Sequence, residues 1–130
     1  MEDGSAIVDI CITLRNNISL LLSDLQHSMG SFRHATPNLR QLPSELASLH
    51  LTIEAIQNSF ERTASSSITL RTNLESVMAG CDYVIQEMRD VLAQDQASPS
   101  DAGSSAMKRL LPGLEAHRSA IQIALELLLL

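Results

Sequence analysis

Apolar residues recur at intervals of three and four in four segments of the chain, and this spacing constrains the fold more than any other feature. Residues at these intervals share one side of an α-helix. The pattern predicts helices over about residues 5–33, 37–62, 67–93 and 105–130. We therefore expect an all-α fold, a four-helix bundle that is largely antiparallel and built from long helices.

Each predicted helix carries one apolar stripe that we expect to face the core. The four stripes are Ile7, Cys11, Leu14, Ile18, Leu21, Leu25, Met29 and Phe32; Leu39, Leu42, Leu46, Leu49, Ile53, Ile56 and Phe60; Leu70, Leu74, Val77, Cys81, Val84, Met88 and Val91, flanked by Met78, Ile85 and Leu92; and Met107, Leu110, Leu111, Leu114, His117, Ile121, Ala124, Leu125 and Leu128. Aromatic residues make up only 2% of the 130 residues, so the core must be aliphatic. An aliphatic core favours helix-on-helix packing over a β-sandwich or barrel. The length fits one domain.

The breaks between the stripes predict how the helices connect. Residues 62–67 form a short polar connection, so we expect the second and third helices to be antiparallel neighbours. Residues 94–104 contain Pro, Gly and serines and are predicted to be the one clear linker. Pro43 lies inside its stripe without shifting it, which predicts one kinked helix. Pro112 and Gly113 are expected to bend or delay the last helix.

The last helix has more apolar residues than one stripe requires, because its end is apolar nearly all round. Three explanations remain open: the helix lies centrally among the others, it faces a partner such as a second copy or a following domain, or it touches a membrane. A smaller excess lies in the first helix. The candidate partner contacts are Ala120, Ile123, Leu127, Leu130, Val8 and Ile12. The pattern stops in mid-stripe, so we also expect this domain to be the N-terminal part of a longer protein.

The charge of the chain limits its partners. The net charge is -6, and the nine basic residues are scattered. Nucleic acid binding needs a basic stripe that neutralises phosphates, so we expect none. Helices that lie on membranes usually carry Lys and Arg as well, which makes a membrane the less favoured partner. We expect protein partners: the chain itself, a downstream domain or other helical domains.

The cysteines and the N-terminus predict a cytoplasmic protein. Cys11 and Cys81 occupy apolar helical positions and are predicted to be buried free thiols, with a disulfide between them as the minor alternative. The first residues lack the basic region and the cleavage site of a signal peptide. No uninterrupted apolar run reaches the roughly 18 residues that a membrane span requires.

The sequence contains no motif for catalysis or for cofactor binding. Its five glycines are isolated, so there is no phosphate-binding loop. His27 and His34 lack a third ligand for a metal ion. The carboxylates are spread along polar helix faces, which is typical of solvated surfaces and not of acid–base pairs. We expect a non-enzymatic protein without a cofactor or a metal.

Three stretches carry a resemblance to a known family: the leucine-spaced residues 38–49, residues 74–88 around Cys81, and the closing residues 117–128. They resemble the fungal N-terminal domain that precedes nucleotide-binding (NACHT) and ankyrin-repeat regions in STAND signalling proteins of filamentous fungi. The resemblance implies a helical adaptor or effector module in non-self recognition, related in form to HeLo-like cell-death domains.

These observations lead us to expect an interaction or signalling module that acts through helix–helix contacts and oligomerisation. Two alternatives remain. One is a HeLo-like effector that perturbs membranes, and the other is a free-standing structural helical protein.

Overall fold

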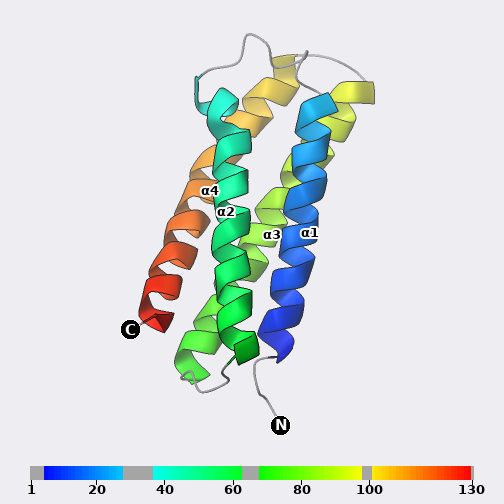
Figure 1. The fold of residues 1–130 in the computed structure, drawn as a ribbon. Coiled ribbons are helices and arrows are strands. Elements are labelled where there is room, and N and C mark those ends of the chain that lie inside the picture. Colours follow the sequence, from blue (N-terminus) through cyan, green and yellow to red (C-terminus); the bar gives the residue numbers. More distant parts are fainter. Residues whose placement is uncertain (1–4, 28–36, 63–67, 98–100, 130) are drawn as a thin grey trace.

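Four helices make up the part of the chain that the structure describes. They are α1 (Ser5–His27), α2 (Pro37–Arg62), α3 (Ile68–Ala97) and α4 (Asp101–Leu128). The structure is a computed structural model, and it describes these helices together with Leu129. The helices form an elongated four-helix bundle in which consecutive helices run in opposite directions (Figure 1). The predicted fold class is confirmed.

The helices follow the order α1, α2, α4, α3 around the bundle. α1 and α4 each pack against α2 and α3, whereas α1 and α4, like α2 and α3, lie diagonally opposite each other. The prediction that the second and third helices are neighbours is therefore wrong. Five extended residues span up to about 16–18 Å, and the diagonal of a bundle with helices about 10 Å apart is about 14 Å. A connection as short as residues 63–67 therefore suits a neighbouring or a diagonal helix equally well.

Two polar contacts show the parallel register of α1 and α3. Nδ2 of Asn17 donates to Oδ1 of Asp82 at 2.7 Å, and Nε of Arg89 donates to Oδ2 of Asp24 at 2.9 Å. On each helix the two residues are seven positions apart, which is about two helical turns. Both contacts therefore lie along the same edge of the bundle, one above the other.

The core is one buried cluster to which all four helices contribute. Its members are Ile7, Cys11, Leu14, Ile18, Leu21, Leu25, Leu42, Leu46, Leu49, Ile53, Ile56, Phe60, Leu74, Met78, Cys81, Val84, Ile85, Met88, Leu92, Met107, Leu111, Leu114, Ile121 and Leu125. Each of these residues belongs to a predicted stripe or flanks one, whereas some predicted members, such as Val77 and Val91, are only half-buried against the cluster. The predicted core residues Met29 and Phe32 lie outside the described residues. Full burial of each large aliphatic side chain contributes about 1.5–3 kcal/mol.

The helix boundaries differ from the predicted ones mainly between the third and fourth helices. α3 continues to Ala97 and α4 begins at Asp101, so the predicted linker over residues 94–104 is wrong for most of its length. Gln, Asp and Ala are compatible with a helix, and Asp and Ser are favoured where a helix begins. A lack of large apolar residues therefore does not end a helix. The predicted end of the first helix, beyond His27, lies outside the described residues.

Two prolines lie inside helices. α2 runs through Pro43 as one helix, as the unshifted stripe predicts. α4 runs through Pro112, so of the two expected effects, a bend or a delayed start, the delay is wrong. A proline inside a helix costs about 3 kcal/mol because it removes a backbone hydrogen bond and crowds the preceding turn. The neighbouring Leu111 and Leu114 are both buried, and their packing offsets part of that cost.

Candidate functional site

α4 carries two apolar stripes on opposite sides. The inner stripe packs into the core through Leu114, Ile121 and Leu125. On the other side, Ile123 is 59% exposed and Leu127 is 52% exposed. The explanation that this helix lies centrally among the others is therefore wrong: α4 occupies a corner of the bundle and contacts only α2 and α3 among the described helices.

We call the residues on the solvent side of α4 the outer stripe. It consists of Pro112, Ala116, Ala120, Ile123 and Leu127. Ala120 is half-buried, Pro112 and Ala116 are exposed, and Leu130, which continues the spacing, lies outside the described residues. From Ala116 onward the stripe alternates steps of four and three, which is the spacing of a coiled-coil seam. The predicted contacts Ala120, Ile123 and Leu127 thus lie in line along one helix.

The outer stripe contains no charged residue, but charges flank it. Oε1 of Gln122 lies 3.4 Å from the hydroxyl of Thr52, which places that side of α4 toward α2. Glu115 and Glu126 share this side with Gln122 because they are spaced by four or seven residues from it. Lys108 lies five turns before Glu126 on the same side. On this edge of α4, Lys108 therefore carries a positive charge, and Glu115 and Glu126 carry negative charges further along.

The opposite edge of α4 packs closely on α3. Nδ1 of His117 lies 2.7 Å from the carbonyl oxygen of Gly113; since a carbonyl can only accept, Nδ1 donates. The other ring nitrogen points at Gly80, where an added Cβ would lie only 2.6 Å from Nε2. A Cβ at Gly113 would meet Val84 at 3.7 Å, an ordinary contact. Gly80 is therefore the residue that lets the two helices approach at this level.

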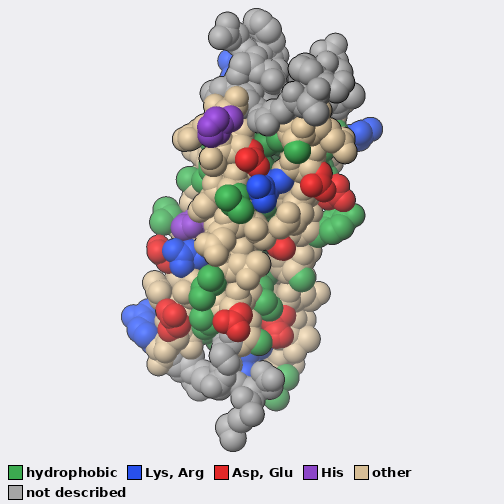
Figure 2. Space-filling view, turned by 90° about the vertical axis from the view of Figure 1, so that its right-hand side faces the viewer, with side chains coloured by type: hydrophobic (Ala, Val, Ile, Leu, Met, Phe, Trp, Pro, Cys, Tyr) green, Lys and Arg blue, Asp and Glu red, His purple; other side chains and the backbone are tan. Residues whose placement is uncertain are grey.

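The remaining predicted contacts lie on a different corner. Val8 is half-buried against the core, and Ile12 is 42% exposed on α1. α1 and α4 are diagonal, so the structure does not bring these residues together with Ile123 and Leu127. Figure 2 looks onto the side where α1 lies, and there hydrophobic side chains are scattered among acidic, basic and other groups. Of the six predicted residues, the five that the structure describes therefore lie on two separate corners of the bundle.

α1 is nevertheless the most apolar helix. Among the described residues, Ala6–His27 is the one helical segment long and apolar enough to cross a membrane by length and composition. Core helices of soluble proteins and signal sequences also meet this criterion. Only 28% of its most apolar window is buried, so α1 is not an ordinary core helix hidden on all sides.

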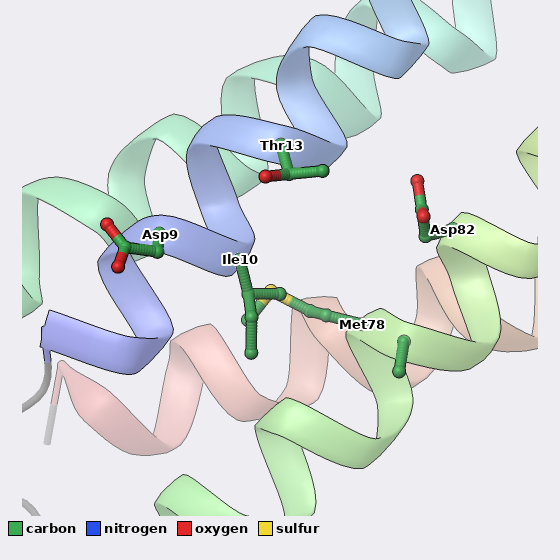
Figure 3. A pocket seen from close by; sticks show the side chains of 6 residues that line it. Asp9, Ile10, Thr13, Met78 and Asp82 are labelled. Atoms are coloured by element: carbon green, nitrogen blue, oxygen red, sulfur yellow. The ribbon is translucent and has the colours of Figure 1, made fainter.

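A shallow pocket of about 260 Å³ lies between α1 and α3. Figure 3 shows Ile10 and Met78 between the two helices, with Asp9 and Asp82 on opposite sides of them. Asp82 already accepts the hydrogen bond from Asn17. A catalytic carboxyl group must lie within hydrogen-bond reach of the proton that it transfers. The lining of this pocket does not by itself assign that role to Asp9 or Asp82.

The two thiols lie in the apolar interior. Cys11 and Cys81 are free and buried, as predicted, and Sγ of Cys11 lies 3.9 Å from Sδ of Met78. Burial raises the pKa of both thiols from 9.0 to about 12. Such thiols stay protonated near neutral pH and are poor nucleophiles. The part of the chain that the structure describes also contains no group of three or more His, Cys, Asp or Glu residues that could hold a metal ion.

The sequence analysis did not predict the polar contacts between helices, because these depend on which helices are neighbours. Arg15 bridges α1 to α2, donating from Nη1 to Gln57 at 2.7 Å and from Nη2 to Glu54 at 3.0 Å. The paired contacts of α1 with α3 at seven-residue spacing are a second example. The shared spacing on both helices was a signal, but it becomes meaningful only once α1 and α3 are known to be neighbours.

Comparisons with known proteins add no identification: no protein-family model, curated protein or solved structure matches the chain.

Proposed function

We propose that this chain is a non-enzymatic interaction module that binds another helix on the outer stripe of α4. The exposure of Ile123 and Leu127, aligned on one face, is the observation that carries the proposal. The inner stripe already anchors α4 in the bundle, so folding does not require these side chains to be apolar. Because each is only 52–59% exposed, burial in an interface would gain about 1–1.5 kcal/mol for each of them.

The shape of the outer stripe also suits a helix as the partner. Ala116 and Ala120 are small, so the backbone of a partner helix can approach closely beside them. Ile123 and Leu127 can then fill the spaces between side chains of the partner, as the seam residues of coiled coils do. An amphipathic helix with its own apolar line is the class of partner that this surface fits.

A signalling role in the cytoplasm is part of the proposal. The resemblance of the chain to the fungal N-terminal domain of STAND proteins supports it, because such a domain would relay a signal to other helical domains.

Site-specific photo-crosslinking tests this function. A photoreactive amino acid replaces Leu127 in one variant and Leu20, which is 46% exposed on diagonal α1, in the control. In cells that produce the protein, we expect protein adducts from position 127 and few from position 20. Equal adducts at both positions, or none at position 127, would refute docking on the outer stripe.

A membrane-perturbing effector is the second candidate, favoured by the apolar composition of α1 and the exposure of Ile12 and Leu20. The exposed Asp9 on the same helix opposes it. If this function holds, the protein at micromolar concentration releases dye from anionic liposomes, and Ile12→Gln with Leu20→Gln abolishes release. The interaction function predicts no release by either protein.

A further inference from the structure

We infer that the partner of the outer stripe is a second copy of this chain, whose α4 packs antiparallel to the first about a two-fold axis. The inference rests on the proposed function and names the occupant of the same surface. A two-fold interface requires that one surface complement itself. The charges beside the outer stripe meet this requirement.

Lys108 and Glu126 carry the charge complementarity. Both are exposed, and neither has an ion pair or a hydrogen-bonding partner among the described residues. They are eighteen residues apart, which is five full turns, so they lie on one line, with Lys108 about two turns after the start of α4 and Glu126 near its end. When a second α4 lies antiparallel, this edge meets the same edge of the copy. Lys108 then faces Glu126 of the second copy, and the two-fold axis repeats the pair.

The same register matches side-chain sizes along the outer stripe. The two-fold axis of this pairing crosses α4 midway between Lys108 and Glu126. Ala116, Ser119 and Ala120 lie near that level, and their small side chains allow the two helices to approach closely. Toward each end, Ile123 lies at the level of Pro112 of the second copy. Leu127 lies beside Arg109 of that copy, whose methylene stem can cover an apolar side chain while the guanidinium stays in water.

The flanking acids distinguish this register from its neighbour. With Lys108 opposite Glu126 of the copy, Glu115 lies opposite Ser119, a neutral residue. A shift by one heptad places Glu115 opposite Glu126 of the copy, and the two negative charges repel each other. The ion pairs therefore select the register and the antiparallel direction, while the apolar stripe supplies the affinity.

The net charge of -6 on each copy opposes association of two copies. Two copies repel each other on average, so they associate best through a face whose apolar centre carries no charge. The outer sides of α1 and α3 include the exposed acids Asp9 and Asp90. On α4 the apolar centre is uncharged, and its two charged ends attract when the helices are antiparallel.

Charge reversal tests the inference on the purified protein. Sedimentation is measured from about 1 to about 300 µM, a range that covers the weak affinity of a small interface. We expect the native chain to approach twice its mass of 14.2 kDa. Lys108→Glu alone and Glu126→Lys alone should each weaken the dimer about tenfold. The double variant, which restores opposite charges in the reversed sense, should return to within about threefold of the native affinity.

Glu115→Lys is the matched control, because its expected neighbour is neutral; it should change the affinity less than about threefold. Circular dichroism verifies that every variant stays folded, which is expected since all three side chains are exposed. A native chain that stays monomeric at the highest concentration overturns the inference, and so does a double variant no tighter than the single ones. If the crosslinks from position 127 join a different protein, the inference fails while the proposed function stands.

Discussion

The two stripes of α4 contain the same residue types in opposite environments. Ile121 and Leu125 are buried, whereas Ile123 and Leu127, only two positions further on, are more than half exposed. The difference arises because α4 has neighbours on two sides only, α2 and α3. Apolarity therefore predicts that a side chain favours a nonaqueous contact, but the placement of neighbouring helices decides whether the fold itself provides one.

Truncation of one isoleucine from each stripe should give the largest difference. Ile121→Ala leaves a cavity in the core and should lower the free energy of unfolding by about 2–5 kcal/mol. Ile123→Ala removes an exposed side chain and should change it by less than about 0.5 kcal/mol. Urea unfolding of the protein at low concentration, where association is negligible, measures both. A loss at Ile123 as large as that at Ile121 would contradict the distinction between the stripes.

On α3, the comparison of a buried residue with an exposed one two positions away concerns two groups that can ionise. The thiol of Cys81 is buried and the phenol of Tyr83 is exposed. Burial raises the pKa of Cys81 and Cys11 to about 12, whereas a hydrogen bond with Glu87 and the charge of that carboxylate raise the pKa of exposed Tyr83. Above pH 9 the unfolded thiols ionise while the folded ones stay protonated. The stabilisation present below pH 9 is therefore lost as the pH rises, by at most about 1.4 kcal/mol per pH unit for each thiol.

We expect the free energy of unfolding to fall by about 2–3 kcal/mol between pH 8 and pH 10 because of the two thiols. The variant with Cys11→Ala and Cys81→Ala lacks both groups, so its stability should depend less steeply on pH, even if it is lower throughout. Urea titrations of both proteins across this range measure the slopes. Equal slopes would contradict the burial of the two thiols in the core.

The inner stripes were predictable from the sequence because helical spacing is a local property. Leu14 or Ile53 is assigned to the core without knowing which helix it faces. The exposed pair on α4 was predictable for the same reason, since Ile123 and Leu127 lie opposite Ile121 and Leu125 on any helix. Whether the candidates on α1 share a surface with this pair could not be predicted, because that step needs the order of the helices around the bundle.

The order of helices depends on a connection whose length suits two arrangements, so spacing alone does not determine it. The close approach of Gly80 and His117 shows the consequence. One residue is small and the other is polar, and nothing in either neighbouring sequence marks them as partners. Their contact follows only from the antiparallel register of α3 and α4, which also sets Val84 beside Gly113.

Two glycine substitutions, one on α3 and one on α4, test the close packing between these two helices. Alanine is favoured over glycine in a helix by about 1 kcal/mol, but a Cβ at Gly80 would lie 2.6 Å from Nε2 of His117. We expect Gly80→Ala to lower the free energy of unfolding by about 1 kcal/mol. Gly113→Ala has room at 3.7 Å from Val84 and should raise it by about 0.5–1 kcal/mol.

The background of His117→Ala provides the control for this contact. Without the imidazole, Gly80→Ala should stabilise the protein by about 1 kcal/mol, the helix propensity alone. Thermal unfolding of the four proteins in this double-mutant cycle gives the coupling. If Gly80→Ala has the same effect with and without His117, the ring does not restrict the space at this position.

The smallest effect is expected for the partly exposed ion pair between Asp24 of α1 and Arg89 of α3, at the edge of the core. The side chains of Arg89 and Asp24 are 31% and 33% exposed, so water screens their attraction. Asp24→Asn should therefore cost about 0.2–1 kcal/mol, and about 1 M salt should reduce this cost. Urea unfolding at low and high salt measures it. A cost comparable to that of Ile121→Ala would mean that polar contacts, and not the inner stripes, hold α1 against α3. A small cost assigns them a role in register, because two contacts seven residues apart form together only when these parallel helices are correctly aligned.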